Sequence, residues 1–379
     1  MSVAPTLDAA RPALAARFDS VLERVGSVRP IAVLRIALGP IVLLHLAPFL
    51  RDARAGVHYD DHFWAPYASF LPRPGGGLWV AALWLGAAAA VLMSLGVLTR
   101  LTTAVTFAVV AGNLVLSQTH LRHNRAFLAI ILGGVALLPA GRVLSVDSWW
   151  RRVRGLRPLG DRALIWPLWL TRVQVSLVYL ASGTSKLIDP DWLSGLVLWD
   201  RVVRYQYVLD PFPVPAWAVD LLTTRALYFV VAPVAVAAEL FVGIALWRRR
   251  TRIGGLWAAV LFHLAIEVSA SVEVFSYGAI AALAIWVTAS TRDRTVRARA
   301  GSAVASAVRW GDWFGRFRLE PPGAGEPDVV VVDRDGTVLT GRAATVLVLS
   351  RLPLTFLVAA PFLLARPSRP APTVAVGAR

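Results

Sequence analysis

Long apolar segments alternate with short polar ones along most of this chain. Runs of about 18 or more largely apolar residues are typical of helices that cross a lipid bilayer. We therefore expect an all-α polytopic membrane protein, a bundle of about eight transmembrane helices with a small cytoplasmic α/β-like tail. The predicted spans are residues 30–50, 78–98, 101–119, 124–141, 164–185, 226–247, 252–270 and 273–290.

The segments outside these spans carry weaker patterns. Residues 7–25 have apolar side chains at helical spacing, which predicts an amphipathic helix on the membrane surface within an N-terminal segment, 1–27. The Arg-, Pro- and Gly-rich stretch 291–328 is interpreted as a cytoplasmic linker. The apolar run 352–365 is too short for a span, and residues 366–379 are expected to be disordered.

Composition and charge support the membrane assignment. Apolar residues make up 57% of the chain, charged residues 16%, and the mean hydropathy is +0.61. If the N-terminus lies in the cytoplasm, most loop arginines fall on the cytoplasmic side. We therefore expect a multi-pass protein of the plasma membrane with both termini cytoplasmic. The net charge of +16 then reflects anchors to the lipid bilayer, and no nucleic-acid partner is expected.

The basic residues are strongly biased in type. Of the 39 basic residues, 38 are arginine and one is lysine, Lys186. Lys186, His123 and His263 lie on or near predicted spans, where ionisable side chains are costly and usually functional. Counting the helical rise from the span ends places all three in the outer half of the bilayer. The absence of cysteine excludes disulfides and thiolate chemistry.

These groups could carry proton transfer. A lysine desolvated by apolar helices can act as a base, and imidazoles can donate to a developing anion. Glu239 and Glu267 are possible partners of His263, and Glu267 lies one helical turn from it. Structural interpretations stay open: His123 as an anchor at the headgroups, Lys186 as a snorkelling side chain and His263 in a hydrogen bond between helices.

At these residues the chain resembles the horizontally transferred transmembrane (HTTM) domain, the membrane domain shared with vitamin K-dependent γ-carboxylases. The resemblance covers residues 28–290 and makes them the principal domain. Its motifs are Leu34–Gly39, His123-Asn124-Arg125 with Ser145-Val146-Asp147, Val178–Leu187 with Asp191–Gly195, and Phe262-His263 with Phe275-Ser276-Tyr277.

The resemblance implies a reaction. In the carboxylases the lysine that corresponds to Lys186 deprotonates reduced vitamin K, and oxygen converts the product into a strong base. That base removes a γ-proton from glutamate, and carbon dioxide traps the carbanion. By this resemblance the cofactor is a reduced quinone, with O2 and CO2 as co-substrates and no metal. The implied catalytic residues are Lys186, His123 and His263, and the implied cofactor contacts are Asn124, Trp192, Phe275, Tyr277 and Glu267.

The chain also departs from the carboxylases. They carry a long luminal β-rich region after the membrane domain, whereas this chain is predicted to turn cytoplasmic at about residue 291. Three hypotheses therefore follow: a carboxylase-like, quinol-dependent membrane enzyme, a non-catalytic binding or accessory protein that retains the fold, and a proton-coupled transporter. The transporter would use His123, His263 and Glu267 as its proton path.

A second resemblance concerns the segment 329–365. Val329–Leu339 predicts a strand, a tight turn and a second strand, and a helical pattern follows. This resembles the second half of a DCC-type thiol-oxidoreductase domain. Because the chain has no cysteine, we interpret the segment as a remnant without redox activity.

Overall fold

A computed structural model describes residues 22–56, 65–71, 75–204, 215–270, 274–287 and 294–363, together with Ser20, Arg73 and Val272. The chain divides into two compact units, Met1–Ala289 and Ser290–Arg379, which are considered separately. Most of the predicted amphipathic helix at 7–25, and the whole predicted tail at 366–379, lie outside the described residues.

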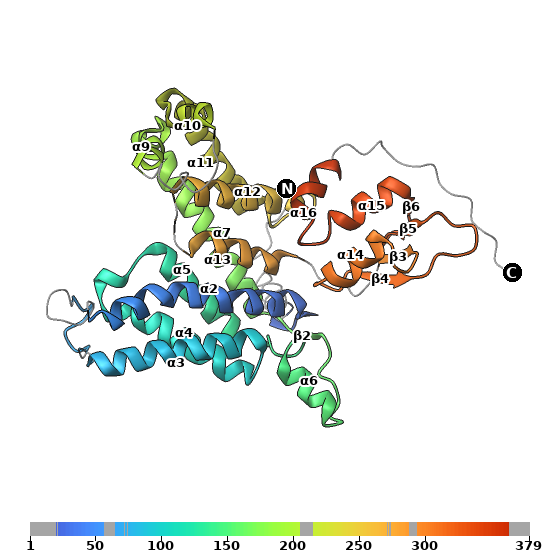
Figure 1. Cartoon of the computed structure of the whole chain (residues 1–379), viewed down its shortest axis with the longest axis horizontal. Helices are drawn as coiled ribbons and strands as arrows, with labels where there is room; N and C mark the ends of the chain where they lie inside the picture. Colours follow the sequence, from blue (N-terminus) through green and yellow to red (C-terminus); the bar gives the residue numbers. More distant parts are fainter. Residues whose placement is uncertain are drawn as a thin grey trace, which may run out of the picture. The chain divides into compact units, whose positions relative to one another are not determined.

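The regular structure described for the first unit is helical apart from two short strands (Figure 1). Its longer helices begin within a few residues of the predicted spans. They are α2 (Arg29–Arg54), α3 (Gly76–Leu95), α4 (Thr99–Leu116), α5 (His123–Ala136), α7 (Pro167–Leu187), α11 (Tyr228–Ala245), α12 (Arg252–Ala270) and α13 (Phe275–Ala282), which continues as the 3-10 turn η4 (Leu283–Trp286). Short helices connect them: η1 (Gln118–His120), α6 (Val146–Val153), α8 (Pro190–Leu193), α9 (Leu196–Arg204), α10 (Ala216–Thr223) and η3 (Arg225–Leu227).

Loop contacts define two ends of this bundle. At one end, β1 (Val25–Ser27) pairs antiparallel with β2 (Arg162–Leu164). At the same end, the carboxylate of Asp147 accepts hydrogen bonds from the backbone N–H groups of Leu98 and Thr99, at 2.8 and 2.9 Å. This contact ties the first turn of α6 to the turn between α3 and α4. We call this end of the bundle the arginine-rich end.

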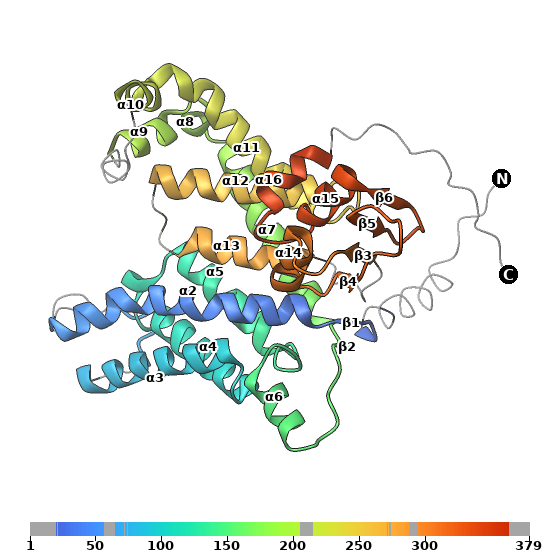
Figure 2. The same ribbon diagram turned by 45° about the vertical axis from the view of Figure 1, so that its right-hand side comes forward.

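Other loops meet at the opposite end. The backbone N–H of Gln118 donates to the carbonyl of Ala65, and the Asn124 amide donates to the carbonyl of Val272 at 3.2 Å. The helices α2, α3, α4, α5, α7, α11, α12 and α13 therefore run alternately between the two ends (Figure 2). This is the connectivity that a chain crossing a membrane repeatedly requires.

Length and composition single out four of the described helices as candidate spans. They are α2, α3, α4 and the segment Arg225–Ala245. The helix α5 and the segment Phe275–Trp286 are apolar but shorter. The early end of α5 has a local cause, because Pro139 disfavours helical geometry at the residue before it. Crossing of the bilayer by all eight helices stays a prediction.

A buried arginine organises the arginine-rich end. Arg35, within the first predicted span, has no exposed surface and donates to the carbonyl of Leu144 at 2.5 Å. Gly96 ends α3 in the left-handed conformation, with φ of +75°. A Cβ atom at Gly96 would lie 1.8 Å from Nη1 of Arg35. Glycine is thus required there both by the backbone and by the neighbouring guanidinium.

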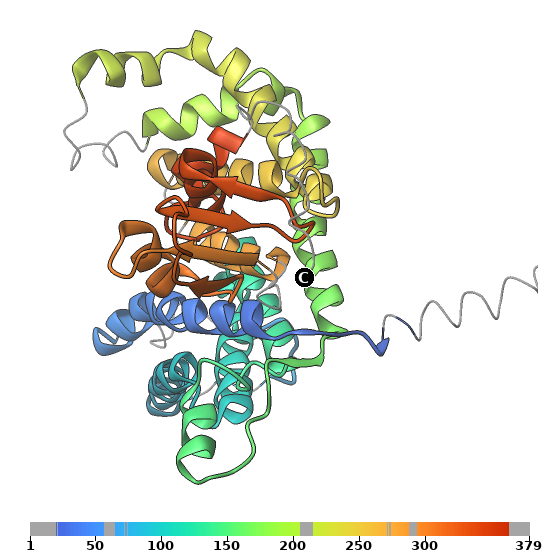
Figure 3. The same cartoon turned by 90° about the vertical axis from the view of Figure 1, so that its right-hand side faces the viewer.

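The second unit is a small α/β fold. Its elements are β3 (Arg294–Ala298), α14 (Ala303–Gly311), β4 (Phe317–Glu320), β5 (Val329–Val332), β6 (Val338–Thr340), α15 (Gly341–Leu349), α16 (Phe356–Ala359) and η5 (Ala360–Leu363). The sheet order is β4-β3-β5-β6, with β3 and β4 parallel and the other pairs antiparallel (Figure 3). The strand pair expected within 329–339 forms β5 and β6.

The interpretation of 291–328 as a linker is wrong. This stretch holds β3, α14 and β4, so the fold of the unit also includes elements that precede residue 329. Arg294 is buried on the same face of β3 as Val296, Arg297 is on the other face, and each arginine pairs with an acid distant in sequence. Arg294 lies 2.7 Å from Asp333, and Arg297 lies 2.6 Å from Glu326. The two arginines of β3 therefore occupy positions in a sheet where an acidic side chain balances the charge of each.

We expect Gly96→Ala to destabilise the first unit more than Gly155→Ala does. Both glycines have positive φ, but a Cβ at Gly155 meets nothing within 4 Å. Backbone strain alone costs about 1–2 kcal/mol, and the clash with Arg35 should bring Gly96→Ala to about 3 kcal/mol or more. Thermal unfolding of the purified variants in detergent measures the difference. Equal melting temperatures would contradict the buried position of Arg35.

Candidate functional site

One stripe of α7 carries the polar side chains of the site. Tyr179, Ser182 and Lys186 stand at positions i, i+3 and i+7, and therefore share a face of the helix. Gly183 lies in the same stripe. A Cβ at Gly183 would come within 2.8 Å of Leu240 on α11. The absence of a side chain at this position allows α7 and α11 to pack closely.

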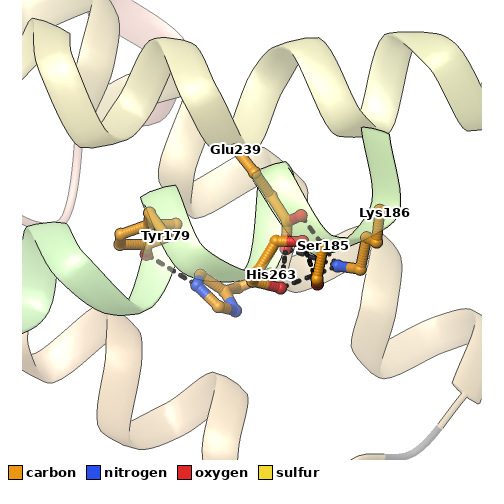
Figure 4. Close-up of polar contacts among 6 residues, drawn as sticks. Tyr179, Ser185, Lys186, Glu239 and His263 are labelled. Atoms are coloured by element: carbon orange, nitrogen blue, oxygen red, sulfur yellow. Dashed lines mark hydrogen bonds and ion pairs between the residues drawn. The ribbon is translucent and has the colours of Figure 1, made fainter. Parts of the chain in front are cut away.

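The close packing brings Lys186 against a carboxylate. Nζ of Lys186 lies 2.7 Å from each carboxylate oxygen of Glu239, and it donates to the hydroxyl of Ser182 at 3.0 Å (Figure 4). The Ser182 hydroxyl in turn donates to Oε1 of Glu239 at 3.0 Å. The Lys186 side chain is 18% exposed and that of Glu239 6%. The ion pair is thus largely buried, and the Lys186 ammonium has three hydrogen-bond acceptors.

An aromatic ring and a second cation complete this end of the site. The Lys186 ammonium lies 4.8 Å from the centre of the Trp192 ring. The guanidinium of Arg201 on α9 lies 5.5 Å from the same ring. Both contacts are within the range of cation–π attraction. Together Lys186, Arg201 and Glu239 leave one net positive charge, which favours a ligand that is or becomes anionic.

A second hydrogen-bonded pair lies deeper on the same stripe. The hydroxyl of Tyr179 and Nε2 of His263 are 2.7 Å apart, and both residues are buried (Figure 4). The His263 ring also packs edge-on against Phe275, with ring centres 5.4 Å apart. His263 is thereby joined to α7 and α13 as well as to its own helix, α12.

Lys186, Glu239 and Arg201 border a cavity of about 630 Å³. It is within the usual size range of small-molecule sites. Its charged end is formed by Lys186, Glu239 and Arg201, with Ser182 and Trp192 beside them. The other lining residues are Leu198, Val202, Leu222, Leu227, Tyr228, Val231, Ala235, Leu261, Phe262, Leu264, Ala265, Ile266, Val272 and Phe275. The cavity is therefore apolar apart from one polar end.

The structure brings several of the predicted residues together. Lys186, Trp192 and Phe275 line the cavity. His263 lies behind it, in contact with Phe275. The side chain of Asn124 binds the backbone of Val272, a lining residue, so its contact with the cavity is indirect.

Three predicted residues lie elsewhere. His123 is exposed at the first turn of α5 and does not line the cavity. Glu267 does not form the suggested pair with His263, whose Nε2 bonds to Tyr179; it interacts with Tyr277 instead. Tyr277 is 45% exposed. Among the described residues, no group of three or more His, Asp or Glu side chains is arranged to hold a metal.

Sequence reasoning missed the partner of Lys186. Glu239 was suggested as a partner for His263, and Ser182 and Arg201 were not considered as site residues. A usable signal was present, since Ser182 and Lys186 are four residues apart on a helix and Gly183 marks a close approach. No such sequence pattern determines which residues of α7 face which residues of α11.

Comparison with known proteins identifies one family. The HTTM domain family model matches residues 26–290, most of the chain and nearly all of the first unit. The resemblance inferred from the motifs is thereby confirmed. No curated protein and no solved structure matches the chain.

The ion pair makes a testable contribution to stability. Glu239→Gln should destabilise the protein by about 3 kcal/mol, because it leaves the Lys186 ammonium buried without a counter-charge. Lys186→Met combined with Glu239→Gln should recover part of that loss, because no unpaired charge remains. Thermal unfolding of Glu239→Gln, Lys186→Met and the double variant completes the double-mutant cycle. A double variant less stable than Glu239→Gln alone would contradict the pairing.

Proposed function

Because this chain belongs to the HTTM domain family, we propose that it is a membrane enzyme of γ-carboxylase-like chemistry. It would bind a reduced quinone in the cavity and take a proton from it at the Lys186–Glu239 pair. Family membership and the apolar helices support an integral membrane protein. The quinone, the reaction and the plasma-membrane location are parts of the proposal.

The single observation that carries the proposal is the position of the ion pair. Lys186 and Glu239, 2.7 Å apart, form the polar end of an otherwise apolar cavity of about 630 Å³. A quinol is also apolar except for its hydroxyl groups, so its ring would suit Leu261 and Phe275 while a hydroxyl faced the pair. When bound, such a cofactor supplies an acidic hydroxyl and, with O2 and CO2, chemistry that side chains lack.

The pair can take up one proton. As an ammonium and a carboxylate it is neutral overall, and the vacant proton position is on Glu239. The Lys186 ammonium can first pass a proton along the 2.7 Å hydrogen bond to Glu239. The amine formed in this way then accepts the proton of the quinol, which leaves Lys186 as an ammonium and Glu239 as a neutral acid. In this proposal the desolvated lysine base expected from the sequence acts together with Glu239, as a coupled Lys–Glu base. The remaining positive charge lies where a developing anion would need it.

The other groups have supporting roles in this proposal. Ser182 bonds to both members of the pair and fixes their orientation. Trp192 and Arg201 border the charged end and exclude water from part of it. The Tyr179–His263 pair supports the wall at Phe275. His123 remains a candidate by the family resemblance alone.

A second candidate is a non-catalytic module that binds an acidic lipid. It is favoured by the net positive charge of Lys186, Arg201 and Glu239 at the end of an apolar cavity. A fatty carboxylate would be held there by charge, and no proton would need to move.

The topology of the proposed enzyme follows from the two ends of the bundle. Arginine side chains are concentrated in the loops at 142–162 and 248–252, at the end where β1 begins the chain's path through the bundle. By the positive-inside tendency this end is cytoplasmic, and Lys186 at the end of α7 is toward the outside. Alternation of eight helices returns the chain to the cytoplasm after α13.

Oxygen consumption with a panel of reduced quinones tests the proposal. Glu239→Gln and Lys186→Arg should each lower quinol-dependent uptake by about a hundredfold or more. The amide cannot take the proton, and arginine keeps its own. Asp200→Asn, which changes a half-exposed carboxylate on α9 paired with Arg204, is the matched control and should leave uptake unchanged.

The outcomes separate the alternatives. Full uptake in Lys186→Arg with loss in Glu239→Gln would assign the base to Glu239 alone. If the folded wild type consumes no oxygen with any quinol but binds fatty acids, and Arg201→Gln abolishes that binding, the lipid-binding module is the better description.

A further inference from the structure

A second cavity lies at the arginine-rich end, far along α7 from Lys186. It has a volume of about 270 Å³. Four arginines and one acid line it: Arg29 at the start of α2, Arg142, Arg151 and Arg152 in and before α6, and Asp161 before β2. Asp161 lies 3.7 Å from Arg29. The side chains therefore leave an excess of three positive charges around a small cavity.

Part of the hydrogen-bonding capacity of these arginines is unused. Nη2 of Arg142 donates to the carbonyl of Leu159, and Nη2 of Arg151 donates to that of Arg157 at 3.4 Å. The Nε atoms of Arg142 and Arg151 are buried and have no hydrogen-bond partner among the described residues. Buried donors without acceptors are unfavourable. An oxyanion in the cavity would supply both acceptors and charge.

The surroundings indicate a lipid rather than a free ion. Beside the cavity, α6 exposes Trp149 and Trp150, at 52% and 47%, together with Val146 and Val153. Tryptophan is enriched where a protein meets the membrane–water interface, and a short helix with such a face lies in that interface. The arginines are thus positioned at headgroup level, with an apolar surface next to them for acyl chains.

We propose that this cavity binds the phosphate of an anionic phospholipid, with Arg142 and Arg151 as its principal ligands. Arginine binds phosphate through two parallel N–H groups, which suits it to this role. Arg29 and Arg152 add charge to the cavity. The lipid would join the start of α2 to the loop before α7. This site is independent of the quinone proposal.

Native mass spectrometry of the full-length protein measures the lipids that it retains. Purified wild type, offered phosphatidylglycerol and phosphatidylcholine, should retain one phosphatidylglycerol preferentially. The double variant Arg142→Gln with Arg151→Gln should weaken that binding about tenfold or more. Arg154→Gln is the matched control, because Arg154 is on the same surface but lies over the Trp150 ring, outside the cavity.

Two further variants test the proposal even if the double variant misfolds. Arg152 is exposed and its Nε bonds to the Ser148 carbonyl within its own helix, so Arg152→Gln should fold and still weaken retention. Asp161→Asn removes the cavity's carboxylate and should strengthen retention. Loss in Arg154→Gln equal to that in the cavity variants would indicate non-specific charge and overturn the proposal. Displacement of the lipid by millimolar inorganic phosphate would overturn the lipid assignment in favour of a free-anion site.

Discussion

The ion pair between Lys186 and Glu239 places the strictest condition on the membrane unit. A carboxylate that is 6% exposed in an apolar bundle is tolerated only if a cation and further hydrogen bonds compensate for its lost hydration. Lys186 and Ser182 supply both, but they reach Glu239 only because Gly183 lets α7 approach α11. The close packing of α7 against α11 is therefore required both by the fold and by the chemistry of the site.

The two ends of the bundle solve different problems with different residues. At the arginine-rich end, Arg35 and Asp147 bind backbone groups of neighbouring loops and hold the turns in register. At the other end the polar groups bind one another and border a cavity. The motif residues on which the family resemblance rests fall into two groups, one at each end of the bundle. Arg35 and Asp147 act on the fold, while Lys186 and Trp192 border the cavity.

The sequence predicted the helices well because the signal is local. Each long apolar run became a helix, and even the short α5 is explained by the proline at 139. The predictions from the sequence failed where the interacting residues are distant in sequence. Glu239 meets Lys186 through the rotation and register of two helices, which apolar patterning does not determine. The strand β3 was read as a linker because its arginines are paired with Asp333 and Glu326, residues about 30 to 40 positions away.

The excess of arginine now has a physical interpretation that depends on place. Arginine keeps its charge at any pH a cell meets, which suits anchors at a headgroup surface and ligands for phosphate. A proton-transfer site needs the opposite property, an amine that can lose and regain a proton beside a carboxylate that can store it. Lys186 is the one lysine of the chain, and it is hydrogen-bonded to the buried carboxylate of Glu239. If Lys186 were only a fixed positive charge, arginine would serve equally, and arginine occupies every other basic position of the chain. The choice of residue therefore argues for chemistry at the pair.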